Sequence, residues 1–273
     1  MNGKINQNEY LTLKYGKIKL IVKKSESFVF YATFIADEYK DLKIKKNDIV
    51  IDFGANIGDF TVKAGKKLDG TGKIIAIEPN HENVELLKEN LKLNKINNVE
   101  ILECAITDKD GYSYLSGNDV AASVNDTYSG NKIRTITIDT LLSQLNHIKN
   151  MVVKMDIEGG ERYIFKNKEF VENTREIAME LHGKENIDEI LKILRYNNFK
   201  ISKYNSKTEF KNTLKSILLH PYDFLKCEKK TKYIALKGAV GTLRGRSPIP
   251  SINREDLMII YASRIEWSEF IIP

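Results

Sequence analysis

The stretch "DIVIDFGANIGDF", residues 48–60, decides the fold of this chain. Its apolar run ends in Asp52, and Gly54 and Gly58 follow shortly after. Glycines allow a tight turn that comes close to a ligand, and the helix expected from Asp59 onward offers free N–H groups to an anion. The stretch therefore predicts a buried strand, a ligand-binding turn and a helix.

The turn differs from the dinucleotide-binding fingerprint G-x-G-x-x-G, because Asn56 stands in place of the middle glycine. The carboxylate of Asp52 would repel a pyrophosphate but attract an ammonium group. S-adenosylmethionine carries an ammonium and a carboxylate on its methionine portion, so it suits an acidic strand end beside an open helix N-terminus. The turn favours this cofactor, and an NAD-dependent dehydrogenase is the less favoured alternative.

From residue 48 onward, short apolar strands alternate with amphipathic helices, which is typical of a parallel α/β sheet. In the helix expected over 80–95, Asn80 is placed to cap the first turn, and Val84, Leu87 and Leu91 form an apolar stripe. A second helix is expected over 185–198. The expected strands are 48–53, 73–77, 99–104, 151–156, 176–181, 199–204 and 231–238.

The alternation is extended at both ends and interrupted twice. Residues 1–47 predict a β-hairpin over 11–24 and a short helix over 34–42. Within the α/β domain, 48–238, the segment 111–141 contains strand-like pieces at 112–115 and 133–138, and 206–230 is expected to be helical. Long excursions of this kind are typical of lids and binding loops. The C-terminal tail, 239–273, could pack on the core or on a partner.

Further candidate ligand-binding residues follow the next two strands of the predicted sheet. Glu78 closes the second strand, where it is placed to accept hydrogen bonds from both ribose hydroxyls of the cofactor. After the third strand, Ala105 and Ile106 would lie against the adenine, with Thr107 or Asp108 as partners of its exocyclic amine. Ordinary strand-end capping is the alternative for the acidic residues. Ligands gather at the carboxyl ends of parallel strands, which favours a binding role.

A second acidic cluster follows the strand in "MVVKMDIEGGERYIF", residues 151–165. Asp156, Glu158 and Glu161 would repel one another unless a cation, a donor or a shared proton relieves them. Asp156 could meet the methionine ammonium or hold the substrate hydroxyl, and Glu158 could act as a base. Glu161 falls in the first turn of a helix, where the helix dipole favours a carboxylate, so a capping role fits it better.

His182, in "EIAMELHG" (176–183), is the histidine expected at the ligand-facing strand ends; His81, His147 and His220 fit surface or packing roles. It could take a proton from a hydroxyl near neutral pH, or it could simply bond a backbone carbonyl. A divalent metal bound by Asp156, Glu158 and His182 is compatible with the ligand types, but the spacing is not diagnostic and we assign no metal from the sequence.

The composition sets wide limits on partners and location. Lys+Arg 43 against Asp+Glu 37 leaves a net charge of +6, which permits nucleic-acid contact without requiring it. The two cysteines form no disulfide framework, and Cys104 is expected to be a small buried residue. The N-terminus lacks a signal-peptide pattern, and no run approaches the about 18 apolar residues that span a bilayer. We expect a cytoplasmic protein.

Several of these motifs, taken together and in this order, resemble the FkbM-type S-adenosylmethionine-dependent methyltransferases. They are "IDFGANIGDFTVKAGKKL", "AIEPNHENVELLKENLKLN", "VEILECAITDKDG", "ITIDTL" and "VVKMDIEGGERYIFKNKEF…EIAMELHG", within residues 28–200. The resemblance implies a class I methyltransferase (Rossmann-like) fold: a mostly parallel seven-stranded sheet with an antiparallel last strand. It also implies methyl transfer, usually to a hydroxyl oxygen of a sugar, glycan or secondary metabolite.

The resemblance also implies residue roles and a product, S-adenosylhomocysteine. Gly160 stands where the family commonly has alanine, and the segments 206–230 and 239–273 have no counterpart in it, so the acceptor stays open. The candidate cofactor-binding residues are Asp52, Gly54, Asn56, Gly58, Glu78, Asn80, Ala105, Ile106 and Asp156. The candidate catalytic residues are Asp156, Glu158 and His182.

The leading hypothesis is therefore O-methylation of a small-molecule or glycan hydroxyl. The basic balance encourages an RNA methyltransferase as the alternative. However, the N-P-P-Y or D-P-P-Y element of many amino-methylating enzymes is missing after the fourth strand, and the acidic "DIEG" found there would repel a phosphate backbone. A non-catalytic module that binds S-adenosylmethionine is a further alternative, against which the Asp/Glu/His set speaks.

Overall fold

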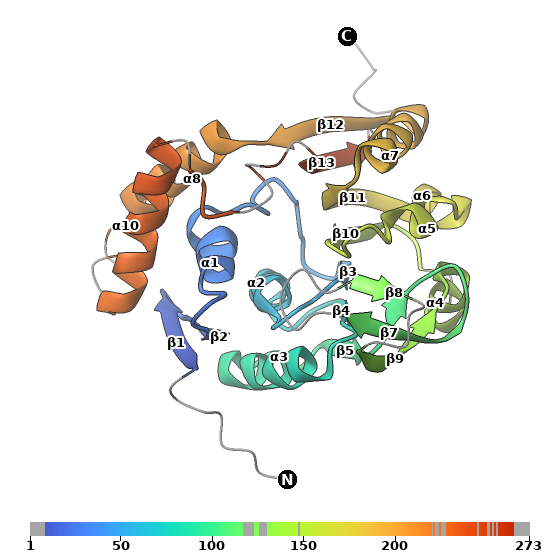
Figure 1. Cartoon of the computed structure of the whole chain (residues 1–273), viewed down its shortest axis with the longest axis horizontal. Helices are drawn as coiled ribbons and strands as arrows, with labels where there is room; N and C mark the ends of the chain where they lie inside the picture. The colour runs from blue at the N-terminus through green and yellow to red at the C-terminus, as the bar shows by residue number, and fades with distance from the viewer. Residues whose placement is uncertain are drawn as a thin grey trace.

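The centre of the protein is a seven-stranded sheet with the order β12-β13-β11-β10-β3-β4-β5 (Figure 1). This computed structural model describes residues 9–264 except 117–122, 126–129, 147, 220, 222–223, 225–227, 245, 250–251, 253 and 255. Strand β13 runs antiparallel to both of its neighbours, and the other neighbouring pairs are parallel. The predicted class I methyltransferase fold, with one antiparallel strand, is confirmed.

The strands of this sheet are apolar because helices cover both of its faces. All five residues of the central strand β10 are buried. The strands are β3 (Ile49–Phe53), β4 (Lys73–Ile77), β5 (Val99–Leu102), β10 (Met151–Met155), β11 (Thr174–His182), β12 (Phe199–Tyr204) and β13 (Leu257–Arg264).

Two apolar clusters lie on opposite faces of the sheet. The first contains side chains of α2 (Asp59–Leu68), α3 (His81–Asn94) and the N-terminal segment. The second contains side chains of α4 (Ile138–Gln144), α5 (Glu161–Phe165), α6 (Lys168–Asn173) and α7 (Lys184–Tyr196). The helices expected over 80–95 and 185–198 are thus confirmed as α3 and α7.

The predicted hairpin is confirmed as β1 (Tyr10–Tyr15) and β2 (Ile18–Lys23). Two buried asparagines of α3 bond the free edge of β2: Asn90 Oδ1 accepts from Ile21 N at 2.7 Å, and Asn94 Oδ1 accepts from Lys19 N at 3.0 Å. An edge strand that is covered in this way cannot pair with another chain.

The short helix predicted over 34–42 is present, but its predicted position is wrong. The helical residues are α1 (Phe28–Phe30) and one wider π-helical stretch, η1 (Tyr31–Ile35). These residues form a nearly continuous buried apolar run, whereas the chain turns at Asp37, which has a left-handed backbone (φ 51°). Burial of the apolar run therefore fixes the helix ahead of the predicted position.

The excursion over 111–141 forms, together with the preceding strand β6, a second, four-stranded sheet with the order β6-β9-β7-β8. Its strands are β6 (Ala105–Ile106), β7 (Gly111–Ser116), β8 (Ser123–Asn125) and β9 (Asn131–Ile136). Both predicted strand-like pieces are confirmed. The second ends at Ile136 because the Thr137 side chain accepts from Thr140 N and caps α4.

The predicted strand 231–238 is wrong, because these residues lie in a helix, α10 (Lys229–Leu243). Its buried residues Thr231, Ala235, Gly238 and Thr242 recur at helical spacing. It packs beside α8 (Ser206–Leu219), which confirms a helical insertion there. The antiparallel last strand, β13, comes instead from the segment 239–273. No helix in the described part of the chain is both long and apolar enough to cross a membrane.

Candidate functional site

The loop after β3 turns sharply against the carboxyl ends of its two neighbours. Gly54 N and Ala55 N donate to Ile77 O at 3.0 and 2.9 Å. A Cβ at Gly54 (φ 72°) would lie 1.9 Å from the carbonyl oxygen of Asp156. Gly58, just before α2, also has a positive φ of 83°, and a Cβ there would lie 2.9 Å from Leu87 Cγ. Both glycines are therefore required by the close packing of this loop.

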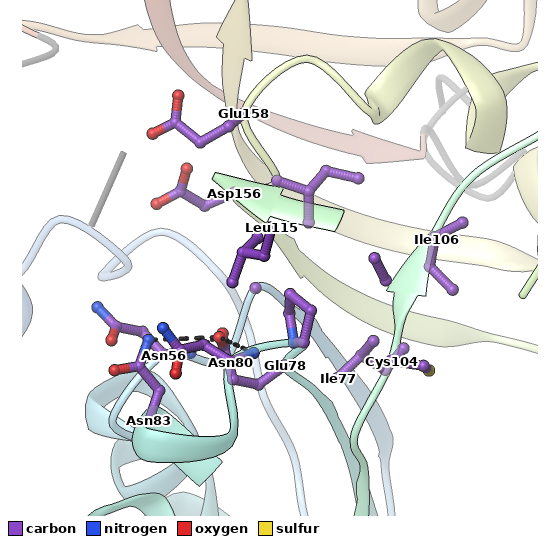
Figure 2. Close-up of a pocket in the computed structure, with 14 residues that line it drawn as sticks. Asn56, Ile77, Glu78, Asn80, Asn83, Cys104, Ile106, Leu115, Asp156 and Glu158 are labelled. Carbon is purple, nitrogen blue, oxygen red and sulfur yellow. Dashed lines mark hydrogen bonds between the residues drawn. The ribbon is translucent and has the colours of Figure 1, made fainter. Parts of the chain in front are cut away.

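Glu78 joins this loop to the turn after β4. The buried carboxylate accepts from Asn56 N at 2.8 Å, from Asn80 N at 2.9 Å and from Asn83 Nδ2 at 3.3 Å (Figure 2). Burial raises the pKa of Glu78, although these donors favour its ionised form. The Asn80 side chain accepts from Glu82 N at 2.9 Å and caps α3, as predicted.

A cavity with about 720 Å³ of empty space, its open mouth included, lies between these turns. Every predicted cofactor-binding residue except Asp52 and Gly58 lines it. One wall is polar, with Asn56, Glu78 and Asn80, and the other is apolar, with Ile106 and Leu115 (Figure 2). This combination suits a nucleoside. Sequence reasoning missed Leu115 because it lies in β7, beyond the motifs on either side.

Asp52 does not reach this cavity, contrary to the expected contact with a methionine ammonium. It has no exposed surface, accepts from Thr61 Oγ1 at 2.5 Å and pairs with Lys154 Nζ at 3.3 Å. Lys154 Nζ in turn donates to Gly54 O at 2.6 Å. Asp52 therefore shapes the glycine loop through Lys154. The physical reason is register, because Lys154 on β10 lies directly beside Asp52 on β3.

Lys154 is a charged residue in an otherwise apolar strand, and this was the available signal of its role. Burial alone would lower the pKa of Lys154, but the negative charges of Asp52, Asp156 and Asp59 outweigh burial and raise the pKa. The residue therefore stays cationic inside the protein and holds the loop after β3.

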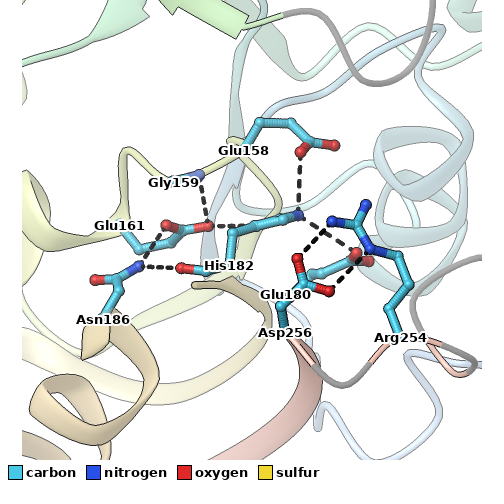
Figure 3. A network of polar contacts seen from close by, with 8 residues as sticks. All are labelled: Glu158, Gly159, Glu161, Glu180, His182, Asn186, Arg254 and Asp256. Carbon is cyan, nitrogen blue, oxygen red and sulfur yellow. Dashed lines mark hydrogen bonds and ion pairs between the residues drawn. The ribbon is translucent and has the colours of Figure 1, made fainter. Parts of the chain in front are cut away.

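The second acidic cluster gathers at the adjoining ends of β10 and β11, around His182 (Figure 3). His182 Nδ1 lies 2.7 Å from Glu161 Oε1, and Nε2 lies 3.3 Å from Glu158 Oε2 and 3.4 Å from Glu180 Oε1. Asp156, Glu158 and His182 each offer an atom within 4.8 Å of the others. The predicted catalytic residues are thus brought together, and Glu180 joins them.

Glu161 does more than the expected helix capping. It begins α5, but its fully buried carboxylate accepts from Gly159 N at 3.2 Å and from Asn186 Nδ2 at 2.9 Å, and it contacts the imidazole. Glu161 therefore fixes the orientation of His182.

Burial and mutual charge shift the pKa values of this cluster. Burial, reinforced by the charge of Glu180, raises the pKa of Asp156 to about 7, and burial also raises the pKa of Glu158. Burial alone would lower the pKa of His182, but the hydrogen bond to Glu161 and the nearby carboxylate of Glu180 outweigh burial and raise the pKa to about 11. In this arrangement His182 is a cation at neutral pH and does not fit the expected role of a base.

A second cavity, with about 780 Å³ of empty space, adjoins the first and shares Gly54, Asn56, Asp156 and Glu158 with it. Glu38 and Tyr39 line it from the N-terminal segment, and Arg254 and Leu257 from the C-terminal segment. Burial raises the pKa of Glu38 to about 8. Neither segment carries a motif, so their meeting at this cavity could not be predicted from the sequence.

The remaining sequence candidates lie apart from the first cavity or behave as expected. Thr107 and Asp108 line a separate depression. Cys104 is a buried free cysteine on the wall of the first cavity, and burial raises its pKa to about 11. His81 is a surface residue, as expected, whereas His147 and His220 lie outside the described residues.

The model of the family described as "Methyltransferase FkbM domain" matches residues 52–201, which include the glycine loop, Glu78 and the acidic residues around His182. The chain belongs to this FkbM methyltransferase family. Its methyl donor is accordingly S-adenosylmethionine, and the family supports S-adenosylmethionine-dependent methyl transfer as its chemistry.

Similar proteins differ in what their names say they act on. The chain is 45% identical over 53 residues to a Sulfurisphaera tokodaii protein named "Probable cobalt-precorrin-6B C(15)-methyltransferase (decarboxylating)", a match that covers 19% of this chain and 28% of that protein. It is 30% identical over 86 residues to a Methanosphaera stadtmanae "Probable ribosomal RNA small subunit methyltransferase A", covering 32% of this chain and 31% of that protein. The chain thus spans about a third or less of the length of these two curated relatives.

Among solved structures, the chain is similar to a methyltransferase FkbM from Methylobacillus flagellatus KT. The two are 19% identical with a TM-score of 0.43, and the match covers 61% of this chain and 42% of that chain.

Proposed function

We propose that this protein transfers the methyl group of S-adenosylmethionine to a hydroxyl oxygen of a sugar, glycan or other small metabolite. The supporting observation is that the two cavities share the carboxylates Asp156 and Glu158. A cofactor in the first cavity and an acceptor in the second would meet at these side chains. The carboxylates would then lie beside the oxygen that receives the methyl group.

In the proposed reaction, a lone pair of the acceptor oxygen attacks the methyl carbon. The bond between that carbon and sulfur breaks with its electrons going to sulfur, which gives S-adenosylhomocysteine. The hydroxyl proton passes to the carboxylate of Asp156 or Glu158. Because the sulfonium is a reactive methyl donor, the protein mainly aligns the two groups and accepts this proton.

The charge of the second cavity favours a neutral acceptor over an anionic one. Its acidic lining residues, which are Glu38, Asp59, Asp156, Glu158 and Glu180, outnumber the basic ones, Lys154 and Arg254. Because like charges close together repel, a phosphate would be disfavoured here. The name of the Methanosphaera relative keeps RNA as the second candidate acceptor.

Methyl transfer from S-adenosylmethionine labelled on its methyl group tests this proposal. We expect label in neutral saccharides or hydroxylated metabolites, and Asp156→Asn or Glu158→Gln should lower the rate by about 10²- to 10⁴-fold, the usual contribution of a proton-accepting group. Glu103→Gln, at an exposed surface pair with His81, is the matched control and should keep full activity.

Two results would contradict the proposal. Label in RNA, with the steep salt dependence of phosphate contacts, would favour the RNA methyltransferase. S-adenosylhomocysteine binding by calorimetry without transfer to any acceptor would favour the non-catalytic module.

A further inference from the structure

The imidazole of His182 is held in one orientation by groups that lie behind it. Nδ1 contacts Glu161 Oε1 at 2.7 Å, and Glu161 is itself fully buried and held by Gly159 N and Asn186 Nδ2 (Figure 3). The side chain of His182 is only 11% exposed. When Glu161 accepts from Nδ1–H, Nε2 is the ring atom that can bind a metal cation, and the cation would displace the proton that Nε2 carries in the imidazolium.

Nε2 of His182 faces two carboxylates, but neither of them lies at a normal hydrogen-bond distance. The atom is buried and has no hydrogen-bond partner among the described residues. It lies 3.3 Å from Glu158 Oε2 and 3.4 Å from Glu180 Oε1, beyond a strong hydrogen bond. A buried ring nitrogen left in this way needs a further partner.

The spacing of the surrounding atoms fits one small cation. Asp156, Glu158 and His182 each offer a ligand atom, and these atoms lie within 4.8 Å of one another. In an octahedral site with bonds of about 2.1 Å, neighbouring ligands are about 3.0 Å apart and opposite ones about 4.2 Å. Small side-chain movements would therefore close the three atoms around a cation.

The charges at this point are also unbalanced. Asp156, Glu158, Glu161 and Glu180 surround a single imidazole. The nearby cations are engaged elsewhere, since Lys154 pairs with Asp52 and Arg254 pairs with Asp256 at 2.6 Å. A divalent cation would relieve the repulsion among these carboxylates.

We propose that Asp156, Glu158 and His182 form a binding site for a divalent cation, with Glu180 beside it and Glu161 as the positioning residue behind His182. One imidazole with several carboxylates suits Mn²⁺ or Mg²⁺ better than a thiolate-preferring metal. Because Asp156 and Glu158 line both cavities, the cation would lie where cofactor and acceptor meet.

The part of this cation in the reaction rests on the proposed function. A cation at the shared wall would bind the acceptor oxygen and orient it toward the methyl group. Two neighbouring hydroxyls of a sugar could occupy two coordination positions together, so the site would favour an acceptor with a vicinal diol. Cation binding itself does not depend on the identity of the acceptor.

Electron paramagnetic resonance with Mn²⁺ tests the site directly, since free Mn²⁺ gives a six-line signal that is lost on binding. The whole chain is treated with a chelator, saturated with S-adenosylhomocysteine and titrated with MnCl₂. We expect one Mn²⁺ per chain, displaced by excess Mg²⁺. His182→Gln should weaken binding at least 10-fold. His81→Gln should not change it, because His81 makes a similar contact with Glu103 (2.9 Å) but is 74% exposed.

The positioning role of Glu161 has its own measurement. Glu161→Gln should lower Mn²⁺ affinity by about 10- to 100-fold, as expected when the partner of a metal-binding histidine is lost. Affinity for S-adenosylhomocysteine, measured by calorimetry, should stay within a few fold and shows that the variant is folded.

Three outcomes would overturn the inference. The first is that wild-type protein leaves the free Mn²⁺ signal intact. The second is that the His182→Gln variant binds Mn²⁺ as tightly as wild type. The third is that the His182→Gln and His81→Gln variants lose Mn²⁺ affinity equally. In each of them S-adenosylhomocysteine binding and methyl transfer can persist, so failure of the cation site is distinguishable from failure of the proposed function. An unchanged rate of methyl transfer to a diol acceptor in the presence of EDTA would show that the cation takes no part in the reaction.

Discussion

Gly54, in the loop after β3, packs closely against the carbonyl oxygen of Asp156. We expect Gly54→Ala to abolish S-adenosylhomocysteine binding and to destabilise the protein strongly, because the new Cβ would collide with the Asp156 carbonyl oxygen. Calorimetry and urea unfolding measure the two effects.

Gly70 provides the matched control for this variant. Its φ of +78° is close to that of Gly54, but a Cβ there would meet no described atom within 4 Å. Gly70→Ala should cost only the left-handed backbone strain, about 1–2 kcal/mol, with cofactor binding intact. Equal losses in the two variants would show that the close approach to Asp156 is unimportant.

The place of a single residue in the site was predictable where it depends on residues nearby in the sequence. The spacing of Gly54, Asn56 and Gly58 after an apolar strand was enough to place the tight turn after β3, and Glu78 follows the next strand. The role of Asp52 was not predictable, because its partner Lys154 lies on another strand and is reached only through sheet register. The contact between Glu161 and His182 is equally non-local.

At the scale of elements, α3 holds the N-terminal hairpin through asparagines. Asn90 accepts from Ile21 N at 2.7 Å and donates to Ile57 O at 2.8 Å and to Ile21 O at 3.1 Å. Asn90→Ala should lower the free energy of unfolding by about 2–4 kcal/mol, because it leaves several buried backbone groups without partners, each costing about 1–3 kcal/mol. Urea unfolding measures this, with Glu89→Ala on the exposed side of α3 as the control. A loss no larger than in the control would contradict it.

The start of β3 is tied to β11 by an ion pair between Asp48 and Arg175, with oxygen–nitrogen distances of 2.8 and 2.7 Å. Burial alone would raise the pKa of Asp48, but the bonds from Arg175 and from Lys45 N outweigh burial and lower the pKa. Because the pKa of Asp48 is lower in the folded than in the unfolded protein, its charge stabilises the fold at any pH above the unfolded pKa of about 3.9. This stabilisation is lost as the pH falls from there through the folded pKa.

Asp48→Asn should therefore destabilise the protein at pH 7 by about 1–3 kcal/mol. The difference from wild type should shrink as pH falls below 4, and thermal unfolding across this range measures it. Asp69→Asn, at the exposed pair of Asp69 with Lys46 (2.9 Å), should change the melting temperature much less. A constant difference from pH 7 to 3 would mean that the charge of Asp48 is not responsible.

Elements with a strong hydrophobic period were predictable, and those that depend on small residues were not. The stripes of α3 and α7 and the apolar central strands all appear where expected. Helix α10 was mistaken for a strand because small side chains at Thr231, Ala235 and Gly238 mark its buried side. Gly238 lies against the Tyr31 ring, so a contact with η1 determines which side is buried.

At the scale of the whole molecule, the second cavity is assembled from three distant parts of the chain. Tyr39 comes from the N-terminal segment, Asp156 from the centre of the sheet and Leu257 from the start of β13. The family motifs in the sequence cover only the central part. The lining of the first cavity was therefore largely predictable, whereas the proposed acceptor cavity required the folded chain.

The place of β13 in the sheet has a consequence for how the protein is made. Residues 257–264 lie between β11 and β12, both of which precede them in the chain. During synthesis the earlier parts of a chain emerge and begin to fold first. Until residues 257–264 have been translated, β11 has an unpaired edge that is open to association with other nascent chains. The central sheet and the wall of the second cavity at Leu257 are completed together, after both neighbouring strands have been made.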